Sequence, residues 1–448
     1  MLGFETIGNA TIIAHDGEPL LATDPWILGE PYFGSWGMSH VIPSAQLDHI
    51  RRCTFVWFSH GHPDHLNADS LDALTDKIIL LPDHVGGRIE AALREAGLNV
   101  RVLRTKAWTE LSPRVKVMCL PDYNQDATLL IAMGRDIVID LNDGSARGYK
   151  RFIAHVASGH RRRYALALRN YGDADMMNLW DETGRFIVPP AAQKPSIGKA
   201  YEELVQQYEA THVIPFSCFH RYQRADSVWA ARYATPLEAH REGFTTRRAE
   251  LLPAFVHVDL ERDVVTELNP APAPSVVKEP REFGDDWSEP LEEDERRLCE
   301  AYFRRKEHVA RTVGFINLRI GGKETRIVLD AGNRRGVTFE CPRRSFVDAV
   351  RWEIFDDLLI GNFMKTTLHG INGLYPDFTP YVAKYGDNGR AQSEAELAAY
   401  FDAYRARSTP VEFLIARLHD RSSAVFRRRF ARDSATFKVA KRAYHLVR

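Results

Sequence analysis

A dense cluster of potential metal ligands at residues 59–65 is the feature that most constrains how this chain folds. The segment reads SHGHPDH and directly follows the apolar run TFVWF, which has the composition of a buried strand. Three imidazoles and one carboxylate fall within residues 60–65, and such groups suit zinc, iron or manganese. Gly61 lets the backbone turn tightly between the first two histidines. The sequence therefore predicts a metal site on a loop at the end of a strand.

The region from residue 1 to residue 268 alternates strand-like and helix-like segments. Residues 70–76 and 86–97 have helical spacing; the first helix is expected to begin at Ser70 and the second to end on Gly97. Strands that alternate with helices predict an α/β sandwich rather than an all-β fold. The expected strands are short apolar runs rich in β-branched residues: ATIIAH, PLLATDP, TFVWFSH, KIILLP, VKVMCLP, TLLIAM, DIVIDL and THVIPF.

A proline-rich segment at residues 269–280, NPAPAPSVVKEP, divides the chain. Its four prolines remove backbone donors and stiffen the chain, as they do in linkers. An acidic helical stretch follows it, and then two strand-like runs joined by a Gly-Gly pair that favours a hairpin turn. The sequence therefore predicts two domains, residues 1–268 and residues 281–448, the second of the α+β class.

The motif HGHPDH resembles the HxHxDH signature of the metallo-β-lactamase superfamily, in which it also follows an early strand. The resemblance implies an αββα sandwich with the metal ligands on loops at one edge. It implies that His60 and His62 serve one metal position, and that Asp64 and His65 serve a second. Asp24 resembles an early aspartate of the superfamily that orients a ligand, with a plain turn residue as the alternative.

Four segments resemble the CMP-N-acetylneuraminate hydroxylase branch of this superfamily: TDPWILGEPYFGSW, QDATLLIAMGRDIVIDLND, PFSCFHRYQRADSVWA and WEIFDDLLIGNFMKTTLHG. They run from Asp24 to about His369, so the resemblance reaches both predicted domains. In that branch a Rieske domain delivers electrons, and its [2Fe–2S] cluster is held by two cysteines and two histidines. This sequence has no Cys-x-His followed by Cys-x-x-His. The resemblance therefore implies either an oxygenase served by a separate electron donor or an enzyme without redox chemistry.

The third histidine of the superfamily follows a strand that corresponds here to VKVMCLP. In this chain Asp122 stands at the matching position, with Asn124 as the second choice, and both residues could instead line the cleft. If Asp122 is a ligand, it forms a set of two histidines and one carboxylate with His60 and His62. Such a set is associated with non-haem Fe(II), whereas three imidazoles would favour zinc.

Two further ligands are expected from the resemblance. Asp143 follows the buried run DIVIDL, where the superfamily has a bridging aspartate whose charge offsets that of the cations. Asp140 is the alternative. His220, after the run THVIPF, is the candidate for the last histidine, either as a ligand or as part of the cleft wall.

Three functions fit these residues. The first is a metal-dependent hydrolase, in which metal-bound water attacks an ester, amide or phosphoester and Asp64 orients or deprotonates that water. The second is a non-haem iron oxygenase acting on a nucleotide sugar or glycan precursor, as the narrower resemblance implies. The third is a non-catalytic binding protein with a weakened site. Both enzymes would hold one or two divalent ions, Zn or Fe, and act on a small molecule.

Composition excludes several other classes. The chain has 59 basic and 60 acidic residues, which does not fit an electrostatic grip on nucleic acid along the whole chain. Five scattered cysteines without a CxxC pair suit a reducing compartment. There is no signal-like N-terminus and no apolar run of the roughly 18 residues that a membrane span needs, so we expect a cytoplasmic protein. Residues 421–448 hold nine Lys or Arg against one Asp, as in a solvated helix face or a contact with an acidic partner.

Overall fold

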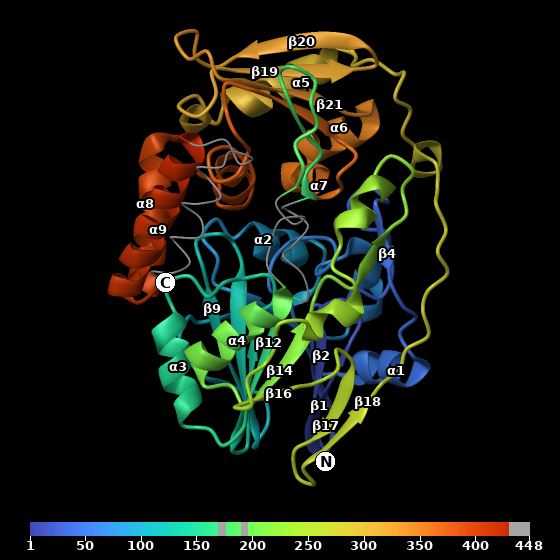
Figure 1. Cartoon of the computed structure of the whole chain (residues 1–448), viewed down its shortest axis with the longest axis vertical. Coiled ribbons are helices and arrows are strands. Elements are labelled where there is room, and N and C mark those ends of the chain that lie inside the picture. Colours follow the sequence, from blue (N-terminus) through green and yellow to red (C-terminus); the bar gives the residue numbers. More distant parts are fainter. Residues whose placement is uncertain (169–175, 190–195, 430–448) are drawn as a thin grey trace.

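Two β-sheets form the centre of the N-terminal part of the molecule (Figure 1). The computed structural model describes residues 1–168, 176–189 and 196–429, so most of the basic tail lies outside the described residues. One sheet has eight strands in the order β18-β17-β1-β2-β3-β5-β6-β7. These are β1 (Leu2–Ile7), β2 (Thr11–Asp16), β3 (Glu18–Thr23), β5 (Phe55–Trp57), β6 (Ile78–Pro82), β7 (Asn99–Leu103), β17 (Val256–Asp259) and β18 (Val264–Glu267).

The other sheet has seven strands in the order β16-β14-β12-β11-β10-β9-β8. Its strands β8 to β11 pair in antiparallel fashion, whereas β11, β12, β14 and β16 are parallel neighbours. They are β8 (Thr109–Glu110), β9 (Val115–Pro121), β10 (Ala127–Met133), β11 (Asp136–Asp140), β12 (Arg163–Leu168), β14 (His212–Phe216) and β16 (Glu250–Leu251). All eight apolar runs that were expected to be strands are strands.

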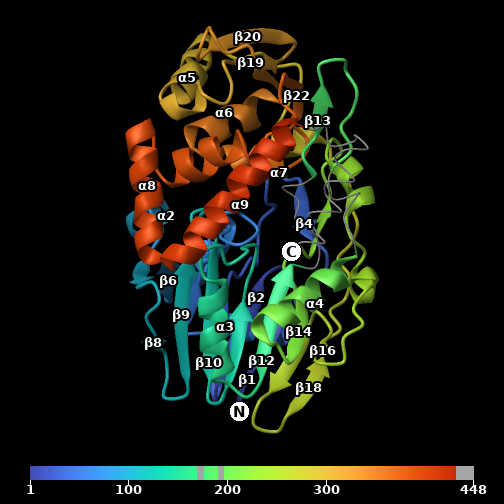
Figure 2. The same cartoon turned by 60° about the vertical axis from the view of Figure 1, so that its left-hand side comes forward.

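Successive side chains of each strand point to opposite faces, so each sheet has an inner and an outer face that both need to be covered. Helices cover the outer faces of both sheets. The inner faces share one core, to which Trp57 and Leu129 contribute. Ile50 and Leu93 pack on the outside of the eight-stranded sheet, and Ile153 packs on the outside of the seven-stranded sheet. These residues lie on α1 (Ser44–Arg52), α2 (Arg88–Glu95) and α3 (Lys150–Ser158), and α4 (Ile197–Tyr208) lies beside α3 (Figure 2). The layers are those of an αββα sandwich, as predicted.

The C-terminal part has its own five-stranded sheet, in the order β13-β22-β21-β19-β20 (Figure 1). The predicted hairpin is present, and Gly321 and Gly322 form its turn with φ of 58° and 73°. The strands are β13 (Leu179–Asp181), β19 (Phe315–Ile320), β20 (Lys323–Val328), β21 (Gly336–Glu340) and β22 (Lys365–His369). The helices are α5 (Glu293–Arg304), α6 (Arg343–Arg351), α7 (Phe355–Ile360), α8 (Glu394–Arg407) and α9 (Pro410–Arg429).

Shorter elements complete the chain. The strands β4 (Trp36–Met38) and β15 (His220–Tyr222) form a small ribbon. The segment that was expected to form a helix from Ser70 is a 3₁₀-helix that begins earlier, because the side chain of Asn67 caps its first turn. The 3₁₀-helices are η1 (Ala68–Leu74), η4 (Val228–Tyr233), η5 (Leu237–Arg241), η6 (Pro280–Phe283) and η7 (Glu307–Val309), and η8 (Pro380–Asn388) is a π-helix.

The proline-rich segment 269–280 runs along the surface of the sandwich. Its backbone makes hydrogen bonds at Ala271 and Ala273 with residues near β4. Strand β13 comes from the N-terminal part of the chain but pairs with β22 in the C-terminal sheet. The division at residues 269–280 therefore stays a prediction, with β13 as a strand that crosses it. In the part of the chain that the structure describes, no helix combines the length and apolarity needed to span a membrane.

Candidate metal centre

The candidate metal ligands gather where several strands end. Asp24 follows β3, residues 59–65 follow β5, Asn142 and Asp143 follow β11, and Ser217 follows β14. The backbone leaves these strands abruptly, with a positive φ at Asp24 (40°), Asn142 (51°) and Ser217 (63°). Each such conformation costs roughly 1–3 kcal/mol for a residue other than glycine, and such residues concentrate at functional sites. The strand ends are thus shaped to aim side chains rather than to continue a regular sheet.

Three side chains form a compact group of possible ligands: His60, His65 and Asp143. Their ligand atoms all lie within 4.8 Å of one another. Asp143 Oδ2 is 3.4 Å from His65 Nε2 and 4.0 Å from His60 Nε2. This group joins the loop after β5 to the loop after β11, so it connects the two sheets of the sandwich.

The surroundings of His65 fit a bound cation. Its ring is fully buried, and neither ring nitrogen makes a hydrogen bond of good geometry with any residue that the structure describes. Carboxylates do surround the ring, with Asp24 3.2 Å from Nδ1 and Asp64 and Asp143 3.3 and 3.4 Å from Nε2, and a metal ion at Nε2 would satisfy that nitrogen among them. Burial lowers the pKa of His65, but the carboxylates of Asp64, Asp143 and Asp24 together raise it well above its usual range. This excess of negative charge is the environment that a divalent cation would neutralise.

His60 has the protonation state that a metal ligand needs. Burial, with His65 and His62 close by, lowers the pKa of His60 well below its ordinary value, so the imidazole is neutral. Its Nδ1 is 2.8 Å from the hydroxyl of Ser59. Its other ring nitrogen, Nε2, therefore points toward the compact group, and it also lies 2.8 Å from His62 Nδ1.

Asp24 lies where a carboxylate can orient a histidine ligand. Its Oδ1 accepts a hydrogen bond of 2.8 Å from the backbone N–H of Ser59, and its Oδ2 lies 3.2 Å from His65 Nδ1. The amide of Asn142 donates to the same Oδ2. A carboxylate on the outer nitrogen of a ligating histidine fixes the tautomer and the ring orientation. The geometry is that of the orienting role that the resemblance implies for this residue.

Asp64 is held from several sides. Tyr32 Oη donates to its Oδ1 at 2.5 Å, and Asn9 Nδ2 donates to its Oδ2 at 2.8 Å, with His65 Nε2 3.3 Å away from Oδ2. Burial raises the pKa of Asp64, but His65, His62 and the bond from Tyr32 together lower it. Asp64 is not part of the compact group among the described residues. Its predicted roles as ligand and catalytic base stay predictions, and the contacts favour an anchoring role.

The C-terminal part contributes a carboxylate that sequence reasoning missed. Asp356, on α7, places its Oδ2 3.1 Å from His62 Nε2 and 3.3 Å from Lys384 Nζ, which comes from η8. Burial raises the pKa of Asp356, but Lys384 and His62 bring it to about 2, so it is ionised. The sequence signal was the acidic pair Asp356-Asp357 within an otherwise apolar helix. Without the fold, nothing in the sequence connected this pair to residues 60–65.

Asp143 and Asp140, the two alternatives after DIVIDL, have different surroundings. Asp143 is 24% exposed, accepts a 2.7 Å hydrogen bond from Ser217 Oγ and faces the histidines. Asp140 is fully buried inside β11 and accepts a bond from the backbone of Asn142. Burial and the nearby carboxylate of Asp24 raise the pKa of Asp140 well above its usual range. The geometry therefore favours Asp143 as the ligand.

Asp122, Asn124 and His220 lie outside the compact group of described residues. Asp122 accepts a 2.7 Å bond from the backbone of Asn124, and burial together with Asp126 raises its pKa to about 7. The ring of His220 stacks on Trp36, with ring centroids 3.4 Å apart. These contacts fit the cleft-wall alternative, and ligation by any of the three stays a prediction.

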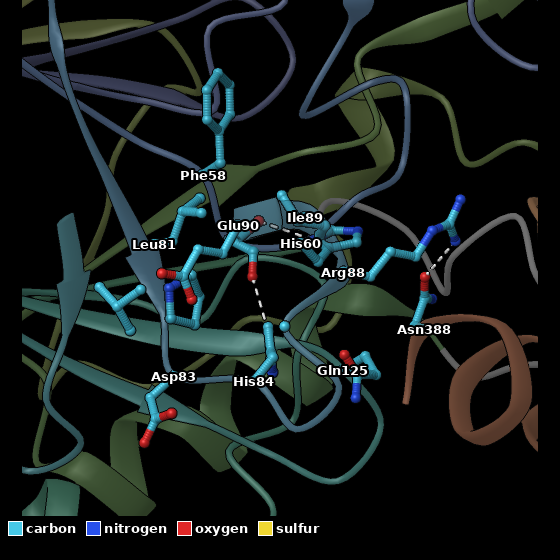
Figure 3. Close-up of a pocket in the computed structure, with 14 residues that line it drawn as sticks. Phe58, His60, Leu81, Asp83, His84, Arg88, Ile89, Glu90, Gln125 and Asn388 are labelled. Carbon is cyan, nitrogen blue, oxygen red and sulfur yellow. Dashed lines mark hydrogen bonds between the residues drawn. The ribbon is translucent and has the colours of Figure 1, made fainter. Parts of the chain in front are cut away.

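Two cavities adjoin the candidate ligands. One of about 190 Å³ lies between the sandwich and the C-terminal part, and its lining includes Gly61, His62, Arg88, Asp356, Asp357 and Asn388. A smaller one of about 40 Å³ lies beside His60 and His84 (Figure 3). Arg88 lines both cavities and donates a 2.9 Å hydrogen bond to Asn388. The smaller cavity includes His60 of the compact group in its lining, and the larger one reaches His62 beside it.

Comparison with known proteins points in the same direction. No family model matches the chain. It is 26% identical over 136 residues to the cytidine monophosphate-N-acetylneuraminic acid hydroxylase of Asterias rubens, and 28% identical over 122 residues to that of Danio rerio. These matches cover 28% and 26% of this chain and 21% of each hydroxylase. The chain has a metallo-β-lactamase-like fold. The named relatives support a metal enzyme with that fold.

Two solved structures resemble this chain distantly. Igni18, a metallo hydrolase from Ignicoccus hospitalis, is 14% identical, with a TM-score of 0.38 over 60% of this chain and 99% of that one. CmlA, a diiron beta-hydroxylase from Streptomyces venezuelae, is 17% identical, with a TM-score of 0.38 over 58% of this chain and 54% of that one.

Proposed function

We propose that this protein is a non-haem iron hydroxylase whose metal is held by His60, His65 and Asp143. The observation that carries the proposal is the compact group itself, two imidazoles and one carboxylate within 4.8 Å of one another. A set of two histidines and one carboxylate with open positions is typical of non-haem Fe(II) oxygenases. The sequence similarity to hydroxylases supports the same chemistry. The centre would hold one or two ions, with iron favoured over zinc.

Bound iron would supply the activation of dioxygen, and the chain's own residues would prepare the site. Asp24 orients His65 through its outer nitrogen. Asp356 accepts from the Nε2 side of His62 and so directs His62 Nδ1 toward His60. Lys384, buried beside Asp356, offsets the charge of that carboxylate. The C-terminal part therefore completes the site that the sandwich begins.

Hydroxylation of a C–H bond consumes one dioxygen, two electrons and two protons, and it yields one C–OH group and one water. The electrons need a donor. All five cysteines are buried and none is in a disulfide in the described part of the chain, and the sequence holds no Rieske motif. We propose that a separate electron-transfer protein reduces the iron.

The substrate we propose is a nucleotide sugar or glycan precursor, following the names of the related hydroxylases. The cavity of about 190 Å³ beside His62 is smaller than the roughly 300–1,000 Å³ of a pocket for a whole drug-sized ligand. It suits the reacting sugar end of such a substrate. Arg88, which lines the cavity, offers a guanidinium for a carboxylate or phosphate group.

Hydrolysis is a second candidate, favoured by Lys384. A buried ammonium group near the metal ligands could stabilise the oxyanion that forms when metal-bound water attacks an ester or phosphoester. The same imidazoles and carboxylate also bind zinc. Hydrolysis would need neither dioxygen nor reductant.

One experiment separates these functions. The protein is purified without chelators, its metals are quantified, and dioxygen uptake is followed with a chemical reductant and a CMP-sugar. Tightly held iron and uptake that rises with the sugar and yields a hydroxylated product are expected. Zinc with hydrolysis of phosphoesters and no uptake would favour the second candidate. A site that stays empty after both metals are added would indicate a binding protein.

A further inference from the structure

A second cluster of histidines surrounds a glutamate on the outer face of the eight-stranded sheet, beneath α1. Glu5 lies on β1, His15 on β2, His49 on α1 and His257 on β17. The pairing of β1 with β17 places His257 directly opposite Glu5. Figure 1 shows α1 in the half of the sandwich away from the C-terminal sheet. This cluster shares no residue with the candidate catalytic centre.

Three histidines surround the carboxylate of Glu5. Glu5 Oε2 is 2.8 Å from His49 Nδ1 and 3.5 Å from His15 Nε2, and Glu5 Oε1 is 2.9 Å from His257 Nδ1. Possible ligand atoms of Glu5, His15 and His49 all lie within 4.8 Å of one another, whereas His257 is not part of this group. His15 and His49 thus present ring nitrogens to the same small volume beside Glu5 Oε2, and His257 holds the other carboxylate oxygen.

His15 supplies an independent sign that something is missing from this volume. Its side chain is 4% exposed, and its Nε2 makes no hydrogen bond of good geometry with any described residue, although it points toward Glu5. A buried polar nitrogen without a partner is costly, and native proteins rarely leave one unsatisfied. A cation there would give this nitrogen a partner, whereas Glu5 is already contacted by Gln46, His49 and His257.

We infer that Glu5, His15 and His49 form a second metal site, which takes a divalent transition-metal ion such as Zn²⁺. Two imidazoles and one carboxylate supply three of the four nitrogen and oxygen ligands of a tetrahedral zinc site, and water would take the fourth position. His49 is 27% exposed, so an ion can enter from solvent at its edge of the cluster. His257 would hold Glu5 in place through the carboxylate oxygen that faces away from His49.

The ion would connect β1 and β2 at the start of the chain to α1. An ion that binds only the folded protein stabilises it by mass action. The proposed role is to fasten α1 to the sandwich, beside the contact that Glu5 makes with His257 on β17.

The test uses the full-length protein after removal of metals with a chelator. Zn²⁺ binding is measured by calorimetry and thermal unfolding in the wild type, in His15→Ala/His49→Ala and in His155→Ala, whose histidine is exposed on α3. The double variant is expected to lose one equivalent of tightly bound zinc, together with part of the zinc-induced rise in Tm. The His155→Ala control should match the wild type in both.

A fourth protein, His60→Ala, distinguishes this site from the catalytic centre. It should keep the zinc equivalent that the His15→Ala/His49→Ala variant loses, so failure of the proposed hydroxylase function would leave this result unaffected. If the double variant does not fold, His49→Gln at the exposed edge replaces it and should weaken the affinity of that equivalent by more than about tenfold. Equal zinc stoichiometry and affinity in the wild type and the Glu5-cluster variants would overturn the proposal.

Discussion

The molecule contains two clusters of histidines around a carboxylate, and they are built in different ways. The catalytic candidate, His60, His65 and Asp143, lies on loops beyond the ends of β5 and β11, and the backbone nearby has positive φ at Asp24 and Asn142. The cluster around Glu5 lies on three regular strands and one helix. Side chains on loops can surround an ion and still leave positions open. Side chains fixed on regular elements hold an ion within the sandwich.

The surroundings of the two clusters also differ. His62, beside the catalytic candidate, lines a cavity and contacts Asp356 from the C-terminal part of the chain. The Glu5 cluster is covered by α1, and its residues line neither of the two cavities described for the catalytic centre. We therefore expect changes at the first cluster to affect turnover and metal content, and changes at the second to affect stability.

The largest effect is expected from His60→Ala. This substitution removes one of the two imidazoles of the compact group, so the catalytic centre should lose its metal and the protein its turnover. The residue is on a loop, so far-ultraviolet circular dichroism should be unchanged. Metal analysis and an activity assay check this result, with His155→Ala as the control. Full metal content in the His60→Ala protein would show that the group is not the metal site.

Next in size is the difference between Asp143→Asn and Asp140→Asn. Asn at 143 keeps the shape but removes the charge beside His65, so turnover should fall by more than the roughly 10–100-fold typical of a residue that merely supports a ligand. Asn at 140 should change turnover little, because Asp140 is fully buried inside β11 and lies outside the compact group of described residues. A greater loss of turnover with Asp140→Asn would reverse the assignment.

Asp356→Asn should have an intermediate effect. The carboxylate contacts His62, whose other ring nitrogen lies 2.8 Å from His60 Nε2, so its loss should disturb the ligand His60 indirectly and lower turnover by about tenfold. Asp348→Asn, on the partly exposed face of α6, is the matched control and should be silent. If both variants have wild-type kinetics, the C-terminal part does not contribute to the catalytic centre.

The smallest effect on turnover is expected from Glu5→Gln. In the presence of a chelator the variant should unfold with a free energy lower by about 1–3 kcal/mol, because buried hydrogen bonds to a carboxylate are weakened. Its turnover should stay close to that of the wild type once the catalytic metal is supplied. Urea denaturation and steady-state kinetics measure the two quantities. A loss of turnover without a loss of stability would contradict the proposed division of roles.

The sequence predicted the sandwich and the metal loop because both depend on local patterns. Alternating apolar runs identified the eight strands, and the spacing of His60, His62 and His65 indicated a metal site within one short segment. The choice between Asp143 and Asp140 stayed open in the sequence, because it depends on the surroundings: Asp143 lies beyond the end of β11 near His65, whereas Asp140 is buried within the strand.

What the sequence could not provide depends on contacts between distant segments. Asp356 meets His62 across 294 residues, and Glu5 meets His257 across 252 residues. Neither pair has a spacing that a local pattern can reveal. The small ribbon of β4 and β15 places His220 against Trp36, a contact that the order of residues in THVIPFSCFH does not show.

The proposed iron centre is tested most directly by a crystal structure of the protein purified without chelators. Anomalous diffraction is recorded at the iron and zinc absorption edges. We expect an iron peak bonded to His60, His65 and Asp143, at about 2.0–2.2 Å from the nitrogen and oxygen ligands. We also expect Asp356 to contact His62 without entering the compact group. An iron or zinc peak elsewhere in the cleft, with Asp143 pointing away from it, would show that His60, His65 and Asp143 do not hold the metal.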